Sequence, residues 1–161
     1  MAVVDYFLKI TDIPGESQDD KHKDEIQCES WTMGATNLGT GEAGGGSGGG
    51  RSAHEDMKFT AKMSKASPKL FLACATGQAI DKAVLTCRKA GKDPQEFLKI
   101  TLSDVFVSSY QSTGSGKEVV PLDNFSLNFA KIEKSYAPQK KDGSLDSPIV
   151  HNYDLKANKA G

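Results

Sequence analysis

Residues 64–77 read SKASPKLFLACATG and carry the strongest helical signal in the chain. Ser67 can cap a helix N-terminus, and Pro68 suits the first turn, where its missing N–H would have no partner anyway. The six residues after Lys69 are all apolar, and Gly77 can end the helix in a left-handed conformation. Because a short helix that is apolar on every side must be enclosed, this stretch predicts one buried helix held against other structure.

Strand-like sequence lies on both sides of the helix. Residues 3–10 and 57–63 alternate in side-chain type, and the segments 79–90 and 96–110 predict a hairpin around the turn at 91–94. Residues 11–24 and 137–148 are polar and are expected to be loops. The chain ends with a predicted last strand that contains Ile149, Val150, Tyr153 and Leu155.

Three predicted strands have unusual patterns. In residues 26–33, Ser30 and Thr32 are expected to share a face with Ile26 and Cys28, so neither face of that strand is purely apolar. Asp104 suggests a bulge in the strand that follows the hairpin turn. The apolar residues 125, 127 and 129 change phase near Ala130, which suggests a bend from one sheet into another.

The predicted fold is mainly β: a compact antiparallel barrel or two-sheet sandwich with one short helix. A chain of 161 residues suits a single domain, 1–161. Its 20 basic and 21 acidic residues give a net charge of -1, without a basic cluster interleaved with aromatics, so nucleic acid is not an expected partner. The N-terminus resembles neither a signal peptide nor a membrane span, because Asp5 and Lys9 interrupt its apolar run.

No catalytic, metal or cofactor site is expected. Three cysteines without CxxC spacing favour buried thiols over zinc or a disulfide framework. The GSGK at 114–117 lacks the residues and the helix of a phosphate-binding loop, because Glu118 follows where Ser or Thr belongs. His54, Glu55 and Asp56 are consecutive, and neighbours in an extended segment point to opposite faces. The sequence therefore does not indicate an enzyme.

Residues 39–55, GTGEAGGGSGGGRSAHE, predict a flexible glycine-rich loop within the domain. A loop this long in a compact domain is usually functional or disordered. A long arm between two strands can bridge surfaces that a tight hairpin cannot reach.

Four segments in this order resemble the haemolysin-coregulated protein (Hcp) family. They are FLKITDIPGESQDDKHKDEIQCESW, KASPKLFLACATG, AVLTCRKAGKDPQEFLKITLSDVFVSSYQSTGSG and LNFAKIEKSYAPQKKDGS. The resemblance implies a hexameric ring of β-barrels, stacked into the inner tube of the type VI secretion system and exported with effectors in its lumen. Implied partners are further copies of the chain, the spike protein, the contractile sheath and effectors. We expect assembly in the bacterial cytoplasm and export without a cleaved signal peptide. We do not expect insertion into a membrane.

The resemblance also directs attention to two groups of residues. Ser30 and Thr32 are candidates for effector contact in the lumen; the alternative is that they merely fill space on a partly buried face. The glycine-rich loop is the candidate for contact between stacked rings, with the residues Glu42, Gly44, Gly50, Arg51 and His54. A different function remains open from the residues alone: a monomeric β-barrel that binds a small ligand or oligosaccharide, with this loop as a lid.

Overall fold

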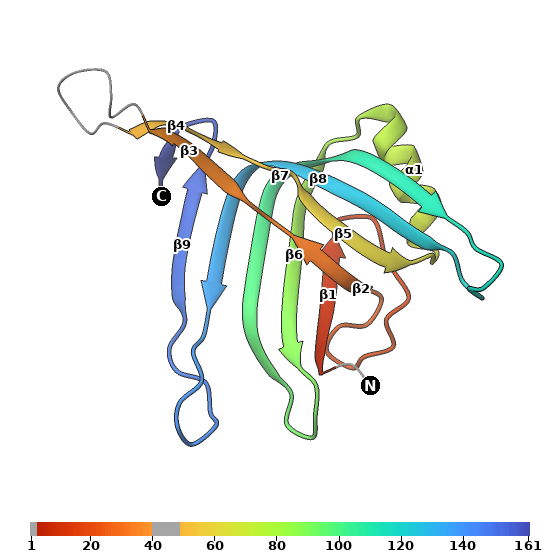
Figure 1. Cartoon of the computed structure of the whole chain (residues 1–161), viewed down its shortest axis with the longest axis horizontal. Coiled ribbons are helices and arrows are strands. Elements are labelled where there is room, and N and C mark those ends of the chain that lie inside the picture. The colour runs from red at the N-terminus through yellow and green to blue at the C-terminus, as the bar shows by residue number, and fades with distance from the viewer. Residues whose placement is uncertain (1–2, 40–48) are drawn as a thin grey trace.

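The structure, a computed structural model, describes residues 3–39 and 49–161. Within them the chain forms ten strands and one helix (Figure 1). In chain order these are β1 (Val4–Ile10), β2 (Ile26–Thr32), β3 (Ala35–Gly39), β4 (Gly49–His54), β5 (Met57–Lys62), α1 (Ala66–Thr76), β6 (Ile80–Lys89), β7 (Gln95–Thr113), β8 (Leu122–Tyr136), β9 (Ile149–Asp154) and β10 (Lys159–Ala160).

Six antiparallel strands close into a barrel, which confirms the predicted fold. Their order is β8-β5-β2-β1-β6-β7, and β7 pairs again with β8. Strand β8 divides its second edge between two partners, because residues 122–127 pair with β5 and residues 131–136 pair with β9. Strands β9 and β10 thus extend the sheet beyond the closed barrel, at the side of the molecule away from α1 (Figure 1).

Strands β7 and β8 bend together. On β7 the buried positions change from Leu98, Ile100 and Leu102 to Val105 and Val107, and Asp104 between them has a φ of +52°. The pairing of β7 with β8 keeps its register through this point and shifts only between Val107 and Ser109. The bulge predicted at Asp104 is therefore a coordinated bend, and the break in register comes further along the strand.

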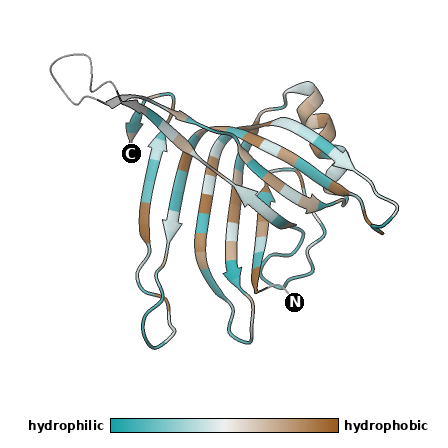
Figure 2. Ribbon diagram, viewed as in Figure 1, coloured by the Kyte–Doolittle hydropathy of each residue, from teal (hydrophilic) through white to brown (hydrophobic). Residues whose placement is uncertain are grey.

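The bend on β8 confirms the phase change predicted near Ala130. Phe125, Leu127 and Phe129 are buried on the first half of the strand, and Ala130 and Ile132 are buried on the second half. Because β7 changes phase opposite this point, both strands direct apolar side chains into the same core after the bend. The alternating brown and teal bands of the strands in Figure 2 follow this division between the core and the outer surface.

Helix α1 packs on the barrel through one face only. Leu70 and Ala73 are buried, whereas Phe71 and Leu72 are 59% and 57% exposed. The expectation that the helix is enclosed on every side is therefore wrong for the single chain. A helix that lies on a barrel contacts it along one stripe, so residues of equal hydrophobicity fall on covered and uncovered sides.

The helix ends also correct one prediction and confirm another. Ser67 lies inside the first turn, where its hydroxyl accepts the Ser64 N–H at 3.0 Å and donates to the buried carboxylate of Asp123. It is therefore not the cap: the N-cap position is Lys65, whose side chain makes no capping bond, and the Ser64 hydroxyl before it accepts the Ala66 N–H at 3.2 Å. Gly77 does end the helix with a φ of +65°, as predicted.

The segment between β1 and β2 covers the outer side of β1, although it was predicted to be an exposed loop. Phe7 on β1 is 1% exposed because the His22 ring stacks on it, with 4.5 Å between ring centroids. The guanidinium carbon of Arg88 lies 4.8 Å from the centre of the same Phe7 ring. An aromatic side chain on the outer face of the barrel thus anchors this loop by stacking and by a cation–π contact.

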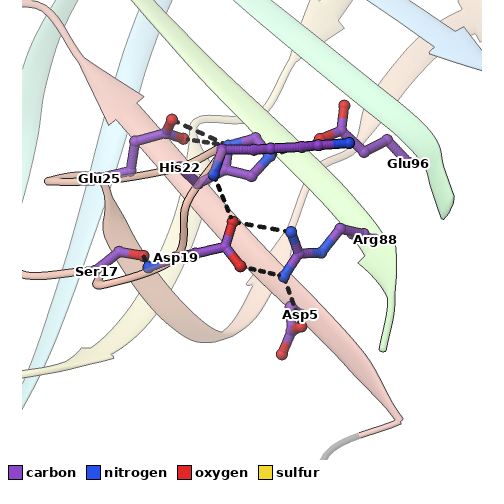
Figure 3. A network of polar contacts seen from close by, with 8 residues as sticks. Asp5, Ser17, Asp19, His22, Glu25, Arg88 and Glu96 are labelled. Atoms are coloured by element: carbon purple, nitrogen blue, oxygen red, sulfur yellow. Dashed lines mark hydrogen bonds and ion pairs between the residues drawn. The ribbon is translucent and has the colours of Figure 1, made fainter. Parts of the chain in front are cut away.

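Ion pairs complete the attachment of this loop (Figure 3). The Arg88 guanidinium donates to both carboxylate oxygens of Asp19, at 2.9 and 2.7 Å, and to Asp5 at 3.3 Å. These bonds hold the pKa of the Asp19 carboxyl at about 2, below its ordinary 3.8. The two ring nitrogens of His22 lie 3.0 Å from the Glu25 carboxylate and 2.6 Å from that of Glu96. The loop is therefore attached to β6 by the ion pair between Asp19 and Arg88, and to β7 by the contact between His22 and Glu96.

The described residues contain no helix long and apolar enough to cross a membrane. Within the same ranges, no group of three or more histidine, cysteine or acidic side chains is arranged to hold a metal ion. All three cysteines are free, and burial raises the pKa of the Cys28 and Cys87 thiols above the ordinary value.

Candidate functional site

A bulge in β2 decides where the two predicted lumen residues point. The pairing of β2 with β5 shifts register between Cys28 and Ser30. Cys28 faces the core, but after the shift Trp31 packs against the core and Ser30 and Thr32 are exposed. The prediction that Ser30 and Thr32 share a face with Cys28 is therefore wrong. Both side chains belong to the outer face of the barrel wall and do not fill space beside the core.

Ser30 and Thr32 are part of a larger polar surface, which we call the polar grid. It consists of two rows of side chains that run across the four neighbouring strands β2, β5, β8 and β7, as the strand pairings define. The first row is Ser30, Thr60, Asn124 and Gln111, and the second is Thr32, Lys58, Ser126 and Ser109. Together they line a shallow groove of about 530 Å³.

The grid is almost free of charge. Seven of its eight side chains are hydroxyls or amides, and Lys58 is the single charged residue that lines the groove. A quarter of the chain as a whole is charged, so this face departs from an ordinary solvent-exposed surface. Neighbouring groups bond to one another: the Thr60 hydroxyl donates to the Asn124 amide oxygen at 2.8 Å, and the Ser109 and Ser126 hydroxyls lie 2.5 Å apart.

The groove presents mainly hydrogen-bonding side chains. Its lining includes no carboxylate, imidazole or thiol, and its polar side chains are hydroxyls, amides and the Lys58 ammonium group. The aromatic residues below the grid, Phe59 and Phe125, stack on each other with ring centroids 5.3 Å apart and are buried in the barrel. Both residues belong to the lining of the groove beneath the polar side chains.

The residues predicted for ring stacking are only partly described. Glu42 and Gly44 lie outside the described residues. Gly50 and Arg51 belong to β4, which pairs antiparallel with β3, so the predicted loop over 39–55 includes a strand at its second end. We refer to this β3–β4 hairpin as the arm. It continues outward from β2 and β5 and projects from the barrel, toward the side where β9 lies (Figure 1).

His54 lies at the base of the arm. Its ring stacks on Tyr153 of β9, with 5.3 Å between centroids, and meets Phe129 of β8 edge-on at 6.4 Å. Its Nε2 lies 3.2 Å from the Ser52 hydroxyl. His54 therefore connects the arm to the strands that extend the barrel, and it does not line the groove of the polar grid.

Large apolar side chains are exposed at several places among the described residues, and at two of these places an adjacent pair lies on a helix or strand. One is the outer face of α1, with Phe71 and Leu72. The other is β9, where Ile149 and Val150 are 57% and 44% exposed. The two surfaces, which we call the helix face and the β9 face, lie on opposite sides of the molecule (Figure 1). Exposed apolar patches of this kind mark surfaces for contact with other proteins.

Sequence reasoning missed most of the polar grid. The alternation of residues 57–63 did show that Lys58 and Thr60 face away from the core. Nothing in the sequence indicated that Asn124 and Gln111 lie beside them, because those contacts depend on which strands are neighbours in the closed barrel.

Comparison with known proteins gives matches over almost the whole chain. The family model described as "Type VI secretion system effector, Hcp" matches residues 7–136. Protein hcp1 of Pseudomonas aeruginosa is 41% identical over 157 residues, which cover 96% of this chain and 97% of that protein.

Solved structures agree with these matches. The crystal structure of Hcp1 from Salmonella typhimurium is 34% identical, with a TM-score of 0.80, and the alignment covers 99% of this chain and 100% of that one. A structure described as that of a type six secretion system protein is 30% identical, with a TM-score of 0.91, and the alignment covers 98% and 99% of the two chains. These matches agree with the sequence segments and with the closed barrel and its single described helix. The chain therefore belongs to the Hcp family of type VI secretion proteins.

Proposed function

We propose that this protein is a non-enzymatic tube subunit of the type VI secretion system. It forms hexameric rings, the rings stack into the inner tube, and the tube is expelled with effector proteins in its lumen. The observation that carries this proposal is the 41% identity to Protein hcp1 across 96% of the chain. Seven of the eight side chains of the polar grid are hydroxyls or amides, and this supports a role in binding by hydrogen bonds.

Ring formation requires two different surfaces on each subunit, because a ring is built from head-to-tail contacts. The helix face and the β9 face meet this requirement, since they are both apolar and lie on opposite sides of the barrel. In the ring, Phe71 of one subunit packs near Ile149 and Val150 of the next. This arrangement also covers the outer side of the helix, which the single chain leaves exposed.

Light scattering and negative-stain imaging of the purified protein test the ring. We expect the mass of six chains and annular particles for the unmodified protein. The substitution Phe71→Asp is expected to yield single chains that remain folded, because Phe71 contributes little to the core. Lys69→Asp, on the same helix and also exposed, is the matched control and is expected to leave the ring intact. A single-chain mass for the unmodified protein would contradict the ring and favour the monomeric binding module.

The polar grid faces the lumen in this proposal. Ser30 and Thr32 then contact cargo, because they are exposed and belong to a surface of small hydrogen-bonding groups. Thr32→Glu is expected to reduce the retention of a lumen-bound effector in a pull-down without changing the mass of the ring. Unchanged retention by this variant would place the cargo contact elsewhere.

The arm contacts the adjacent ring in this proposal. Its strands β3 and β4 give residues 40–48 a base that projects from the barrel. Deletion of residues 44–50 is expected to shorten tubes in electron micrographs while hexameric rings persist. Normal tubes from the deletion variant would refute this role. The further proposed partners are the spike protein, the contractile sheath and effectors. In this proposal the tube is assembled before export, and export does not use a cleaved signal peptide.

A further inference from the structure

We infer that the polar grid selects cargo with an acidic surface, and that Lys58 and Asn124 bind its carboxylates. This inference rests on the proposed lumen position of the grid and adds the chemical class of the partner. Its basis is the distribution of charge and of hydrogen-bond donors over the eight side chains of the grid.

The first observation is the charge of the groove. Lys58 is exposed and lies in the second row of the grid, with Thr32 on one neighbouring strand and Ser126 on the other. The groove lining contains no acidic side chain; Asp56, two residues before Lys58, lies outside the lining, and its carboxylate accepts a hydrogen bond from the Asn128 amide at 2.8 Å. The Lys58 ammonium group is also without an ion pair among the described residues. A cation on a face of neutral hydroxyls attracts an anionic partner and disfavours a cationic one.

The second observation is the direction of the amide of Asn124. Its oxygen accepts the hydrogen bond from Thr60 at 2.8 Å. Its NH₂ group therefore remains as the outward donor, and an amide NH₂ can donate two hydrogen bonds. Asn124 lies on β8 two residues from Ser126, which is directly opposite Lys58 on β5. The groove thus presents an ammonium and an amide donor near each other, and carboxylate oxygens are the acceptors that suit both.

Six copies of the grid in a ring multiply this preference. Each subunit contributes one Lys58, so weak contacts to several carboxylates act together on a single cargo protein. A single surface ion pair is worth at most about 1 kcal/mol, which corresponds to about fivefold in affinity. Retention of cargo during transport, with release after expulsion, is consistent with contacts of this strength.

The test uses the purified full-length protein and two fluorescein-labelled peptides of equal length, poly-glutamate and poly-lysine. We expect fluorescence anisotropy to show binding of poly-glutamate only, and added salt to weaken that binding. Lys58→Gln is expected to weaken it by about threefold to fivefold per site, and Asn124→Asp to weaken it as well. Lys99→Gln is the matched control, because Lys99 is exposed on β7 outside the grid and its loss changes the net charge equally.

Three results would overturn the inference: equal binding of both peptides, unchanged binding by Lys58→Gln, or an equal loss in Lys99→Gln and Lys58→Gln. The mass of every variant is measured in the same buffer. A protein that stays a single chain yet binds poly-glutamate through Lys58 would contradict the proposed ring while supporting the acidic selectivity. Intact rings whose binding of poly-glutamate does not depend on Lys58 would support the proposed ring and contradict the acidic selectivity.

Discussion

The ion pair between Arg88 and Asp19 supports a quantitative prediction. Two bonds of 2.9 and 2.7 Å join the guanidinium to both carboxylate oxygens, and Arg88 is largely buried against Phe7. The substitutions Arg88→Met and Asp19→Asn, alone and together, form a double-mutant cycle. Methionine keeps much of the apolar stem of arginine, and asparagine keeps the shape of the carboxylate, so the coupling energy reports the ion pair itself.

The expected coupling follows from the pKa of Asp19. Its lowering from 3.8 to about 2 corresponds to about 2.4 kcal/mol of differential interaction, at 1.36 kcal/mol per pH unit. Because the side chain of Asp19 is 25% exposed, screening by water reduces this value, and we expect a coupling of about 1–2 kcal/mol at neutral pH. Asp5 also accepts a hydrogen bond from this guanidinium, at 3.3 Å, so Arg88→Met by itself loses that weaker interaction as well.

The sign of the pH dependence is fixed by the direction of the shift. A carboxyl whose pKa is lower in the folded chain stabilises the fold above its unfolded pKa, and this contribution is lost as the pH falls toward the folded value. The coupling is therefore full above about pH 5, falls to roughly half near pH 3 and disappears below about pH 2.

Urea unfolding followed by the fluorescence of Trp31, the single tryptophan, measures the coupling. All four proteins are compared at one protomer concentration, because assembly contributes to the apparent free energy of unfolding. A coupling below about 0.3 kcal/mol at neutral pH would refute the reasoning, since exposed pairs contribute that little. A coupling that stays constant between about pH 5 and pH 3 would show that the protonation of Asp19 does not control it.

Two further predictions concern the core. Leu70→Ala is expected to lower the free energy of unfolding by about 3–5 kcal/mol, because it leaves a cavity at a fully buried position on the side of α1 that faces the barrel. The exposed control Lys69→Ala should change the free energy of unfolding by less than about 0.5 kcal/mol. A similar loss in both variants, measured by urea unfolding, would contradict the placement of the helix. Cys28 and Cys87 are expected to resist maleimide labelling near neutral pH until the chain unfolds, because burial raises the pKa of both thiols, that of Cys87 to about 11. Labelling is measured by mass spectrometry, and rapid labelling of either thiol in the native protein would show that the barrel opens locally.

The sequence alone determined the elements whose signal is local. The apolar run that ends at Gly77 produced the helix and its left-handed end, because glycine alone adopts that conformation without cost. The alternation around Met57 produced β5, and the phase change near Ala130 located the bend in β8. Resemblance to the Hcp family supplied the function, which no single residue of the chain carries.

Only the tertiary structure decided which face each residue occupies. A bulge in β2 reversed the side to which Ser30 points, and alternation cannot reveal such a slip, because one extra residue changes the parity of the residues that follow. The helix illustrates the same limit. Leu70 and Phe71 are both apolar, yet one is buried and the other exposed, because only the position of the barrel selects the covered stripe.

Contacts between distant segments were also beyond the sequence. Arg88 is separated from Asp19 by 69 residues, and Thr60 is separated from Asn124 by 64. A polar, charged sequence looks the same whether a loop is exposed to solvent or packed on the barrel. Residues 11–24 therefore gave no indication that they cover Phe7. Closure of the barrel brought these segments together, and it also assembled the polar grid, because four strands from separate parts of the chain contribute one pair of side chains each.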